Sequence, residues 1–366
     1  MILKRLGAEN FRLCEDAGCA FEPGVNVICG INAQGKTTLL EAAWLLTGQR
    51  SFRARSDKEM VRFGAESARL TALVEADGRD HDCELVLGQR RRFSVNGVKR
   101  APLPLRAILF SPADLDLVRG GAAERRRFMD AAISQLRPAY AKALAEASRL
   151  YEHKTRILRD GDPAMMDVLE DFSLRYAAAC SRLIYYRNAW CRRLAETAPE
   201  INAAIGGERL ELSYKTVTGV DPEGKKPAEI YPALVEHWKA HREAEIASGS
   251  CLSGAHKDDI ELSLDGLPAR TYASQGQART AALSLKLAER DISTLDTGEP
   301  PVMLLDDVLS ELDARRQDFV LNSIAGGQVL ITCCEDGGIS ARTGGKVLTV
   351  EAGRVFQNQN ALPGGA

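Results

Sequence analysis

The sequence contains no apolar run long enough to cross a lipid bilayer. A membrane-spanning helix needs about 20 consecutive, mostly apolar residues, and no stretch of the 366-residue chain has that character. The opening segment, MILKRLGAENF, also lacks the apolar core and cleavage site of a secretion signal. We therefore expect a cytoplasmic protein with no membrane partner.

Cysteine is present, but not in the patterns that build disulfide frameworks or zinc sites. The nine cysteines are an odd number, and no C-x-x-C pair occurs among them. Scattered cysteines of this kind are typical of reduced thiols in a cytoplasm. They lie at positions 14, 19, 29, 83, 180, 191, 251, 333 and 334.

An excess of positive charge is also missing. Lys and Arg number 48 against 50 Asp and Glu, so the net charge is −2. A nucleic-acid surface must then be a local basic patch, because the whole chain offers no attraction to phosphates. Three clusters qualify: Arg50, Arg53, Arg55 and Lys58; Arg90, Arg91 and Arg92; Arg125, Arg126 and Arg127. We take Arg53, Arg55, Arg91 and Arg126 as candidate contacts to DNA backbone phosphates, although arginine runs also form ordinary solvated faces.

One segment carries a specific phosphate-binding pattern. The stretch GINAQGKT, residues 30–37, has the spacing G-x-x-x-x-G-K-T, with an apolar strand expected before it at 25–29 and a helix after it. Glycines let backbone amides turn inward around phosphates, the lysine reaches the outer phosphates, and the threonine hydroxyl binds Mg²⁺. A chance glycine turn is the alternative, but the strand and helix around it disfavour that. The candidate ATP contacts are Gly30, Ile31, Asn32, Ala33, Gln34, Gly35, Lys36, Thr37 and Thr38.

A second pattern supplies the carboxylates that such a loop requires. In VMLLDDVLSELD, the apolar residues 302–305 predict a buried strand, and Asp306 and Asp307 follow at its end. Asp306 is the candidate metal residue together with Thr37, and Asp307 is the candidate for orienting or deprotonating the attacking water, with Lys36 as the other catalytic candidate. Two helix-capping carboxylates are the alternative interpretation.

The segments between these two motifs change character from strands to helices. Residues 68–99 predict a β-meander with turns at Asp77-Gly78 and Asn96-Gly97. Residues 122–160 and 167–196 each show helical spacing of apolar residues around a short turn, which predicts an antiparallel helical arm. We therefore expect an α/β ATPase head made of residues 1–112 and 249–366, split by an inserted helical arm at 113–248.

A third motif resembles a known class. Ser274, Gly276 and Gln277 in ASQGQART open an expected helix, and this resembles the signature motif of ABC-type ATPases. In that class the motif binds the γ-phosphate of ATP held by a second subunit, so the resemblance implies a homodimer formed on ATP. Ser310–Asp313 resembles the D-loop of the same class.

The whole chain is similar to the RecF family of SMC-like ABC-type ATPases. The similarity lies in AENFR, RSFRARSDKEMVRFG, FSPADLDLVRGGAAERRRFMD, SGAHKDDIEL, ASQGQART and LLDDVLSELD. It implies ATP and Mg²⁺ as cofactors and binding of duplex DNA at single-strand gaps and junctions. It also implies cooperation with RecO and RecR in loading RecA, a link to the SOS response, and a nucleotide contact for Arg12, which could equally be an edge-strand surface arginine.

Two departures from the ABC-type pattern bear on catalysis. Asp307 stands where that class commonly has Glu, and Cys333-Cys334 follow the strand after which it often has His. We therefore expect a weak, DNA-stimulated ATPase. A transporter-type ATPase subunit and a non-catalytic scaffold switched by ATP are the alternative functions.

Overall fold

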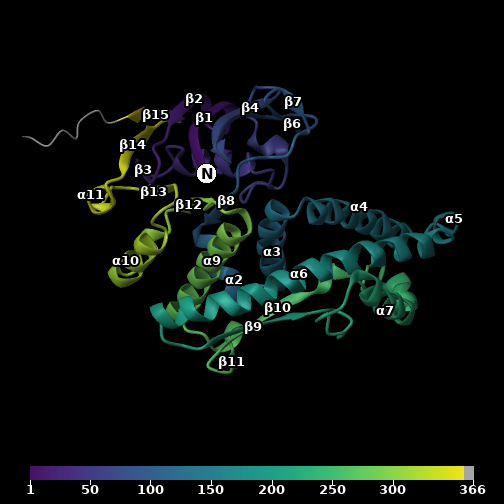
Figure 1. Ribbon diagram of the computed structural model, residues 1–366. Helices are drawn as coiled ribbons and strands as arrows, with labels where there is room; N and C mark the ends of the chain where they lie inside the picture. The colour runs from purple at the N-terminus through teal and green to yellow at the C-terminus, as the bar shows by residue number, and fades with distance from the viewer. Residues whose placement is uncertain (358–366) are drawn as a thin grey trace, which may run out of the picture. The chain divides into compact units, whose positions relative to one another are not determined.

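The computed structural model describes residues 1–357, which fall into two compact units. The head unit contains residues 1–114 together with the chain from Ser293 onwards, and the helical unit contains Leu115–Ile292. Figure 1 shows the elements of each unit in chain order. The two units are described separately below.

The head unit is built around a mainly parallel sheet with the order β15-β14-β3-β13-β12-β8. All neighbours in it run parallel except β14 and β15. Its central strands are fully apolar or nearly so, as expected for strands covered on both faces. The strands are β3 (Val25–Cys29), β8 (Ala107–Phe110), β12 (Val302–Asp306), β13 (Val329–Cys333), β14 (Lys346–Glu351) and β15 (Arg354–Gln357).

A second, antiparallel sheet of the head unit has the order β2-β1-β4-β5-β6-β7. The predicted meander is confirmed: Asp77-Gly78 joins β4 to β5, and Asn96-Gly97 joins β6 to β7, with positive φ at all four residues. The strands are β1 (Ile2–Phe11), β2 (Cys14–Ala20), β4 (Ala68–Ala76), β5 (Arg79–Leu87), β6 (Arg92–Val95) and β7 (Val98–Lys99).

Helix α1 (Lys36–Leu45) packs against strands of both sheets, β1 on one side and β8, β12 and β13 on the other. Nine of its residues are buried, which explains why KTTLLEAAWL shows no polar face. The phosphate loop therefore leads directly into the core of the head unit. The other short elements of this unit are η1 (Asp57–Met60), η2 (Pro112–Leu115), η4 (Leu309–Glu311), α10 (Ala314–Ser323) and α11 (Ile339–Thr343).

The helical unit is dominated by long helices that share one hydrophobic core. Its helices are α2 (Asp116–Arg119), α3 (Ala122–Leu136), α4 (Pro138–Asp160), α5 (Pro163–Met166), α6 (Leu169–Ile205), α7 (Pro227–Ser248), η3 (Ala255–Lys257), α8 (Ala269–Tyr272) and α9 (Gln275–Thr297). A small antiparallel sheet, in the order β11-β10-β9, joins β9 (Leu210–Lys215), β10 (Asp259–Leu264) and β11 (Leu267–Pro268).

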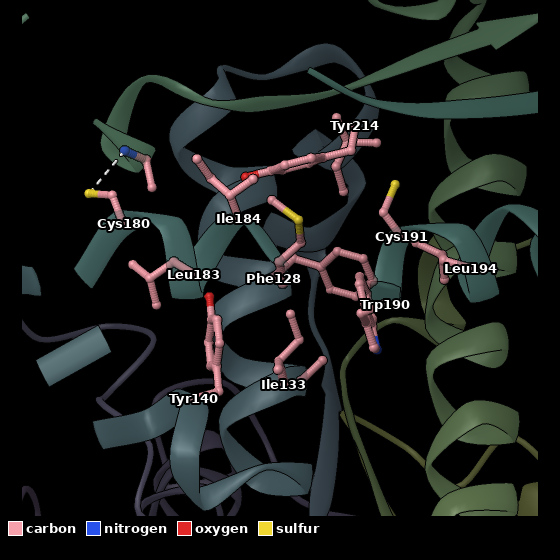
Figure 2. Close-up of a cluster of buried hydrophobic side chains, with 14 of the residues drawn as sticks. Phe128, Ile133, Tyr140, Cys180, Leu183, Ile184, Trp190, Cys191, Leu194 and Tyr214 are labelled. Carbon is pink, nitrogen blue, oxygen red and sulfur yellow. Dashed lines mark hydrogen bonds between the residues drawn. The ribbon is translucent and has the colours of Figure 1, made fainter. Parts of the chain in front are cut away.

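Helices α4 and α6 form the predicted antiparallel pair and lie side by side in Figure 1. Tyr140 contacts Tyr186 and Tyr151 contacts Tyr176, so rising residue numbers in α4 meet falling numbers in α6. In Figure 2, Phe128 of α3 meets Trp190 of α6 edge to face, with ring centroids 5.1 Å apart. Such aromatic pairs add to the free energy of burial that holds the unit together.

One expected helix is interrupted. The sequence predicted a continuous helix over residues 122–160, but Arg137 has an extended backbone and separates α3 from α4. The cause is Pro138, which disfavours a helical conformation in the residue before it and suits the first position of a new helix.

The division between the units also differs from the predicted one at its second boundary. Residues 249–292, which we placed with the ATPase head, group with the helical unit. The reason is strand pairing: β10 pairs with β9 along its whole length, from Asp259 opposite Lys215 to Leu264 opposite Leu210. That pairing joins segments distant in the chain and has no local signature.

A buried histidine gives the helical unit a pH dependence. His256 Nδ1 lies 2.8 Å from the Tyr176 hydroxyl, and His256 Nε2 lies 3.0 Å from the carbonyl oxygen of Cys251. Burial lowers the pKa of His256 to about 4. The folded state therefore favours the neutral imidazole, whereas the unfolded state takes up a proton below about pH 6.5. The stabilisation is fully present above that pH and is lost as the pH falls towards 4.

We predict that His256→Gln flattens this pH dependence. Between about pH 7.5 and about pH 5 the wild type should lose about 2 kcal/mol of unfolding free energy through this residue, and the variant should not. Urea unfolding of the helical signal by circular dichroism measures the difference. His153→Gln, on the exposed side of α4, is the matched control. Equal pH dependence in wild type and His256→Gln would contradict the assignment.

Candidate nucleotide site

The phosphate loop connects the end of β3 to the start of α1, within the head unit. Gly30 and Gly35 have φ of +157° and +109°, values that L side chains rarely adopt. A Cβ on Gly30 would also lie 2.4 Å from the carbonyl oxygen of Val350 in β14. Glycine at the first loop position is thus required by both backbone conformation and packing.

Lys36 closes the loop from inside. Its Nζ donates to the carbonyl oxygens of Gly30 (2.6 Å) and Ile31 (3.2 Å), and the residue is only 7% exposed. The ammonium is therefore held at the mouth of the loop by main-chain oxygens. Two of its three N–H donors are used in this way.

Thr37 and Asp306 come together as the sequence predicted for a metal pair. The Thr37 hydroxyl donates to Asp306 Oδ1 at 2.8 Å. Adjacent oxygen ligands of an octahedral Mg²⁺, each about 2.1 Å from the ion, are separated by about 2.9 Å. A threonine hydroxyl and a carboxylate at this spacing fit that ion. In the described part of the chain, no cluster of three or more His, Cys, Asp or Glu residues suits a metal, so protein ligands alone would not complete the shell.

Thr332 of β13 orients both carboxylate residues. Its hydroxyl donates to Asp306 Oδ1 (2.9 Å) and accepts the backbone N–H of Asp307 (2.9 Å). The parallel register that sets Thr332 beside Asp306 makes this possible. Burial raises the pKa of Asp306, while the hydrogen bonds from Thr37 and Thr332 oppose that rise.

Asp307 lies just outside the buried strand, in a constrained backbone. Its φ is +54°, a left-handed conformation that is uncommon for a non-glycine residue. The hydroxyl of Ser310 donates to the Asp307 carbonyl oxygen at 2.7 Å and lies 3.4 Å from Oδ1. Backbone outliers of this kind concentrate at functional sites.

The outer part of the loop is fixed from two directions. The Gln34 carbonyl oxygen accepts the N–H of Gly353, and its Oε1 accepts the N–H of Ala352, at the β14–β15 turn. The Cys334 thiol donates to Asn32 Oδ1 at 3.1 Å. The loop crest is therefore anchored to the ends of β13 and β14.

Arg12 belongs to a buried ion cluster that sequence reasoning missed. Its guanidinium makes two hydrogen bonds to Glu41 of α1, at 3.0 and 2.7 Å, and Glu41 is fully buried. The Ser51 hydroxyl also donates to Glu41, and Arg53 Nη1 lies 3.7 Å from it. The available signal was the single carboxylate in the otherwise apolar run LLEAAWLL. Arg12 thus ties β1 to α1, and the structure gives it no separate nucleotide contact.

The remaining nucleotide candidates lie in the helical unit. Ser274 precedes α9 and Gln277 is its third residue, and each side chain bonds the other's backbone N–H, at 3.2 and 2.9 Å. This reciprocal pair is a capping box. Ser274 is exposed, and Gly276 is half-buried.

The four candidate DNA contacts differ in how free their side chains are. Arg55 is exposed, and Arg53 is 42% exposed beside Glu41. Arg91 makes two hydrogen bonds to Asp57 and a third to the carbonyl oxygen of Gln49. Arg126 lies in α3 and donates to the carbonyl oxygen of Asp258, and burial lowers its pKa. The structure brings Arg53, Arg55 and Arg91 to one region of the head unit, with Arg126 in the helical unit.

Known proteins resemble this chain over its whole length. A family model described as an AAA domain matches residues 5–95. The DNA replication and repair protein RecF of Lactobacillus delbrueckii subsp. bulgaricus is 37% identical over 100% of this chain and 99% of its own length. Its namesake from Acetivibrio thermocellus is 34% identical, with 97% and 100% covered.

Solved structures give the same answer. The recombination mediator protein RecF-ATPrS in the RecFOR pathway superposes with a TM-score of 0.90 at 32% identity, covering 98% of each chain. The Smc head domain of Pyrococcus furiosus superposes with a TM-score of 0.53 at 16% identity, covering 96% of this chain and 94% of that one. The fold and the loop define an ABC-type P-loop ATPase of the SMC-like class, with additional helical segments.

Within that class, the full-length similarity is decisive. This chain belongs to the RecF family of DNA replication and repair proteins. Among the helices of residues 1–357, none is long and apolar enough to span a bilayer.

We predict that Glu41→Gln destabilises the head unit by about 2 kcal/mol, because it removes the buried charge that balances Arg12. Chemical denaturation measures the change. The matched control is Glu84→Gln, which breaks an exposed pair with Arg69 and should cost less than about 0.5 kcal/mol. Equal effects of the two substitutions would mean that the Arg12–Glu41 pair adds nothing beyond a surface contact.

Proposed function

We propose that this protein is an ATP-dependent, DNA-binding recombination mediator whose ATP-bound form is a homodimer. The observation that carries the proposal is the Thr37–Asp306 contact beside a glycine loop of the required backbone form. Family membership supports the biological role, since a relative of 32% identity is a recombination mediator solved as RecF-ATP. A transporter subunit shares the loop but not the full-length similarity to that family.

ATP would be held by backbone amides of residues 30–37 and by the N-terminus of α1, where the helix dipole favours anions. Lys36, now bonded to Gly30 and Ile31, would turn its ammonium to the outer phosphates. Thr37 and Asp306 would hold Mg²⁺, which neutralises phosphate charge when it is bound. Each of these groups already lies at the loop, so binding needs exchange of contacts rather than refolding.

Hydrolysis would depend on Asp307. Its backbone is fixed by Thr332 and Ser310, so its carboxylate can orient a water against the γ-phosphate. Aspartate is one methylene shorter than the glutamate common in ABC-type ATPases, which is why we propose slow turnover. ATP binding, rather than the chemical step, would then set the conformation, and hydrolysis would release it.

A second subunit would complete each site. Ser274 and Gly276 stand at an exposed helix N-terminus, which suits the γ-phosphate of ATP bound to the partner copy. In a symmetric dimer the same contact is made twice. This arrangement would make DNA-stimulated ATP turnover depend on dimer formation.

The DNA partner we propose is duplex next to a single-strand gap or junction. Arg53 and Arg55 are the side chains most available for backbone phosphates, while Arg91 and Arg126 would act mainly by holding nearby chain in place. By family membership, RecO and RecR would be the helpers, and loading of RecA in the cytoplasm would be the outcome.

The test of the ATPase proposal is complementation between two inactive variants. Lys36→Arg damages the phosphate loop, and Ser274→Arg damages the site offered to the partner. In a 1:1 mixture, half of the dimers are mixed, and each of these has one intact site of two. Turnover should recover to about a quarter of the wild-type rate, with either variant alone close to zero.

Three controls sharpen that measurement. Both variants must bind ATP, and wild-type turnover per subunit must rise with protein concentration. Absence of recovery in the mixture, with wild-type turnover intact, would overturn the role of Ser274 in the partner's site. Absence of any wild-type turnover, with ATP bound, would favour the non-catalytic scaffold.

The proposed DNA contact is tested separately through its salt dependence. Arg55→Gln should reduce the slope of log affinity against log salt by about one for gapped duplex, because one phosphate contact is lost. Arg126→Gln should lower the unfolding midpoint and leave the slope unchanged. Fluorescence anisotropy at several salt concentrations decides this. The assignment fails if Arg126→Gln changes the slope and Arg55→Gln does not.

A further inference from the structure

Two cysteine thiols lie together at the base of the phosphate loop. Cys29 ends β3, Cys333 ends β13, and the two residues are directly paired in the parallel ladder. Their sulfur atoms are 3.6 Å apart. Cys29 immediately precedes Gly30 of the loop, and Cys333 immediately follows Thr332, which orients Asp306 and Asp307.

We propose that Cys29 and Cys333 form a reversible disulfide in the presence of a peroxide, and that this modification weakens nucleotide binding at the adjacent loop. The effect on nucleotide rests on the ATP-binding function proposed above, whereas formation of the disulfide does not.

The backbone geometry permits the bond. Neighbouring strands lie about 4.8 Å apart, and disulfides join Cα atoms separated by about 4.4–6.8 Å. The sulfur atoms already point toward each other and must approach by about 1.6 Å to reach bonding distance. Side-chain rotation with a small shift of the strand ends can supply that movement.

The two thiols differ in reactivity in the way a peroxide-sensitive pair requires. A hydrogen bond from Cys333 lowers the pKa of Cys29, and the charge of Lys36 acts in the same direction, against burial and Asp336. The pKa of Cys333 is raised by the same contact and by burial. Cys29 is half-buried and Cys333 buried, so Cys29 is the thiolate that meets the oxidant.

The chemistry balances in two steps. The Cys29 thiolate attacks one oxygen of hydrogen peroxide, the O–O bond breaks, and a sulfenic acid and hydroxide form. The Cys333 sulfur then attacks the Cys29 sulfur, its proton leaves with the displaced hydroxide as water, and the S–S bond forms. Two thiols and one peroxide give one disulfide and two waters, and an added dithiol reverses the bond by exchange.

Drawing the two sulfur atoms together would disturb the site through neighbouring residues. The Gly30 carbonyl oxygen accepts Lys36 Nζ, and the Gly30 Cα has no spare room beside Val350. On the other strand, Cys334 donates to Asn32 at the loop crest. A shift at either strand end therefore reaches the loop without passing through the rest of the unit.

The other cysteines provide an internal contrast. Burial raises the pKa of Cys14, Cys19, Cys83, Cys180, Cys191 and Cys251. Buried thiols of high pKa react slowly with peroxide. Cys334 is exposed and adjacent to the pair, so it is the one rival partner that the experiment must separate.

The experiment treats the full-length protein with hydrogen peroxide and maps disulfides by mass spectrometry of unreduced proteolytic peptides. We expect one cross-linked peptide pair, Cys29 with Cys333, lighter by two hydrogen atoms and removed by dithiothreitol. A fluorescent ATP analogue should bind about tenfold more weakly to the oxidised protein, and reduction should restore binding. Cys333→Ser and Cys333→Ala should both keep their affinity after peroxide, whereas Cys334→Ser should still form the bond.

Each alternative result decides the matter. A cross-link of Cys29 to Cys334, no cross-link at all, or equal affinity of the oxidised and reduced protein would overturn the inference. If the reduced protein does not bind the analogue while the Cys29–Cys333 cross-link forms, the failure lies in the ATP-binding function and in the claimed effect on nucleotide, and the thiol chemistry itself stands.

Discussion

The hydrogen bond between Thr37 and Asp306 is the contact on which the head unit's site depends. It joins residues 269 positions apart, one at the start of α1 and the other at the end of β12. The strand between β3 and β12 is β13, and its Thr332 completes the contact from the middle. Because three neighbouring parallel strands each end at this edge, one segment of chain alone could not build the site. The same edge is where open parallel sheets generally bind ligands.

Local motifs were readable from the sequence, and long-range pairing was not. The phosphate loop, the strands around 25–29 and 302–305, and the Asp77-Gly78 and Asn96-Gly97 turns each depend on a few adjacent residues, and the structure has them where predicted. The placement of 249–292 failed because the pairing of β10 with β9 is decided by distant chain. Pro138 was visible in the sequence, and its effect on Arg137 follows from proline sterics alone.

Charged residues show the same limit more sharply. A run of arginines has one meaning in composition, yet the structure gives its members different partners. Arg125 makes two hydrogen bonds to Asp259, Arg126 bonds a carbonyl oxygen, and Arg127 pairs with Glu124 on the surface. The buried Glu41 was overlooked for the converse reason, since a single carboxylate in an apolar helix carries no motif. Only the folded positions of Arg12, Ser51 and Arg53 explain why it can be buried.

The groups of the site satisfy one another, and this shapes what a nucleotide must do. Lys36 is bonded to loop carbonyl oxygens, and Thr37 to Asp306. A phosphate therefore replaces existing contacts instead of filling unmet ones, and the net gain is the difference between the two sets. That difference favours phosphate because its oxygens carry full charge, which strengthens hydrogen bonds to an ammonium and to helix N–H groups. Small displacements of the loop change both sets, which is why the residues at the ends of β3 and β13 matter although they need not touch the nucleotide.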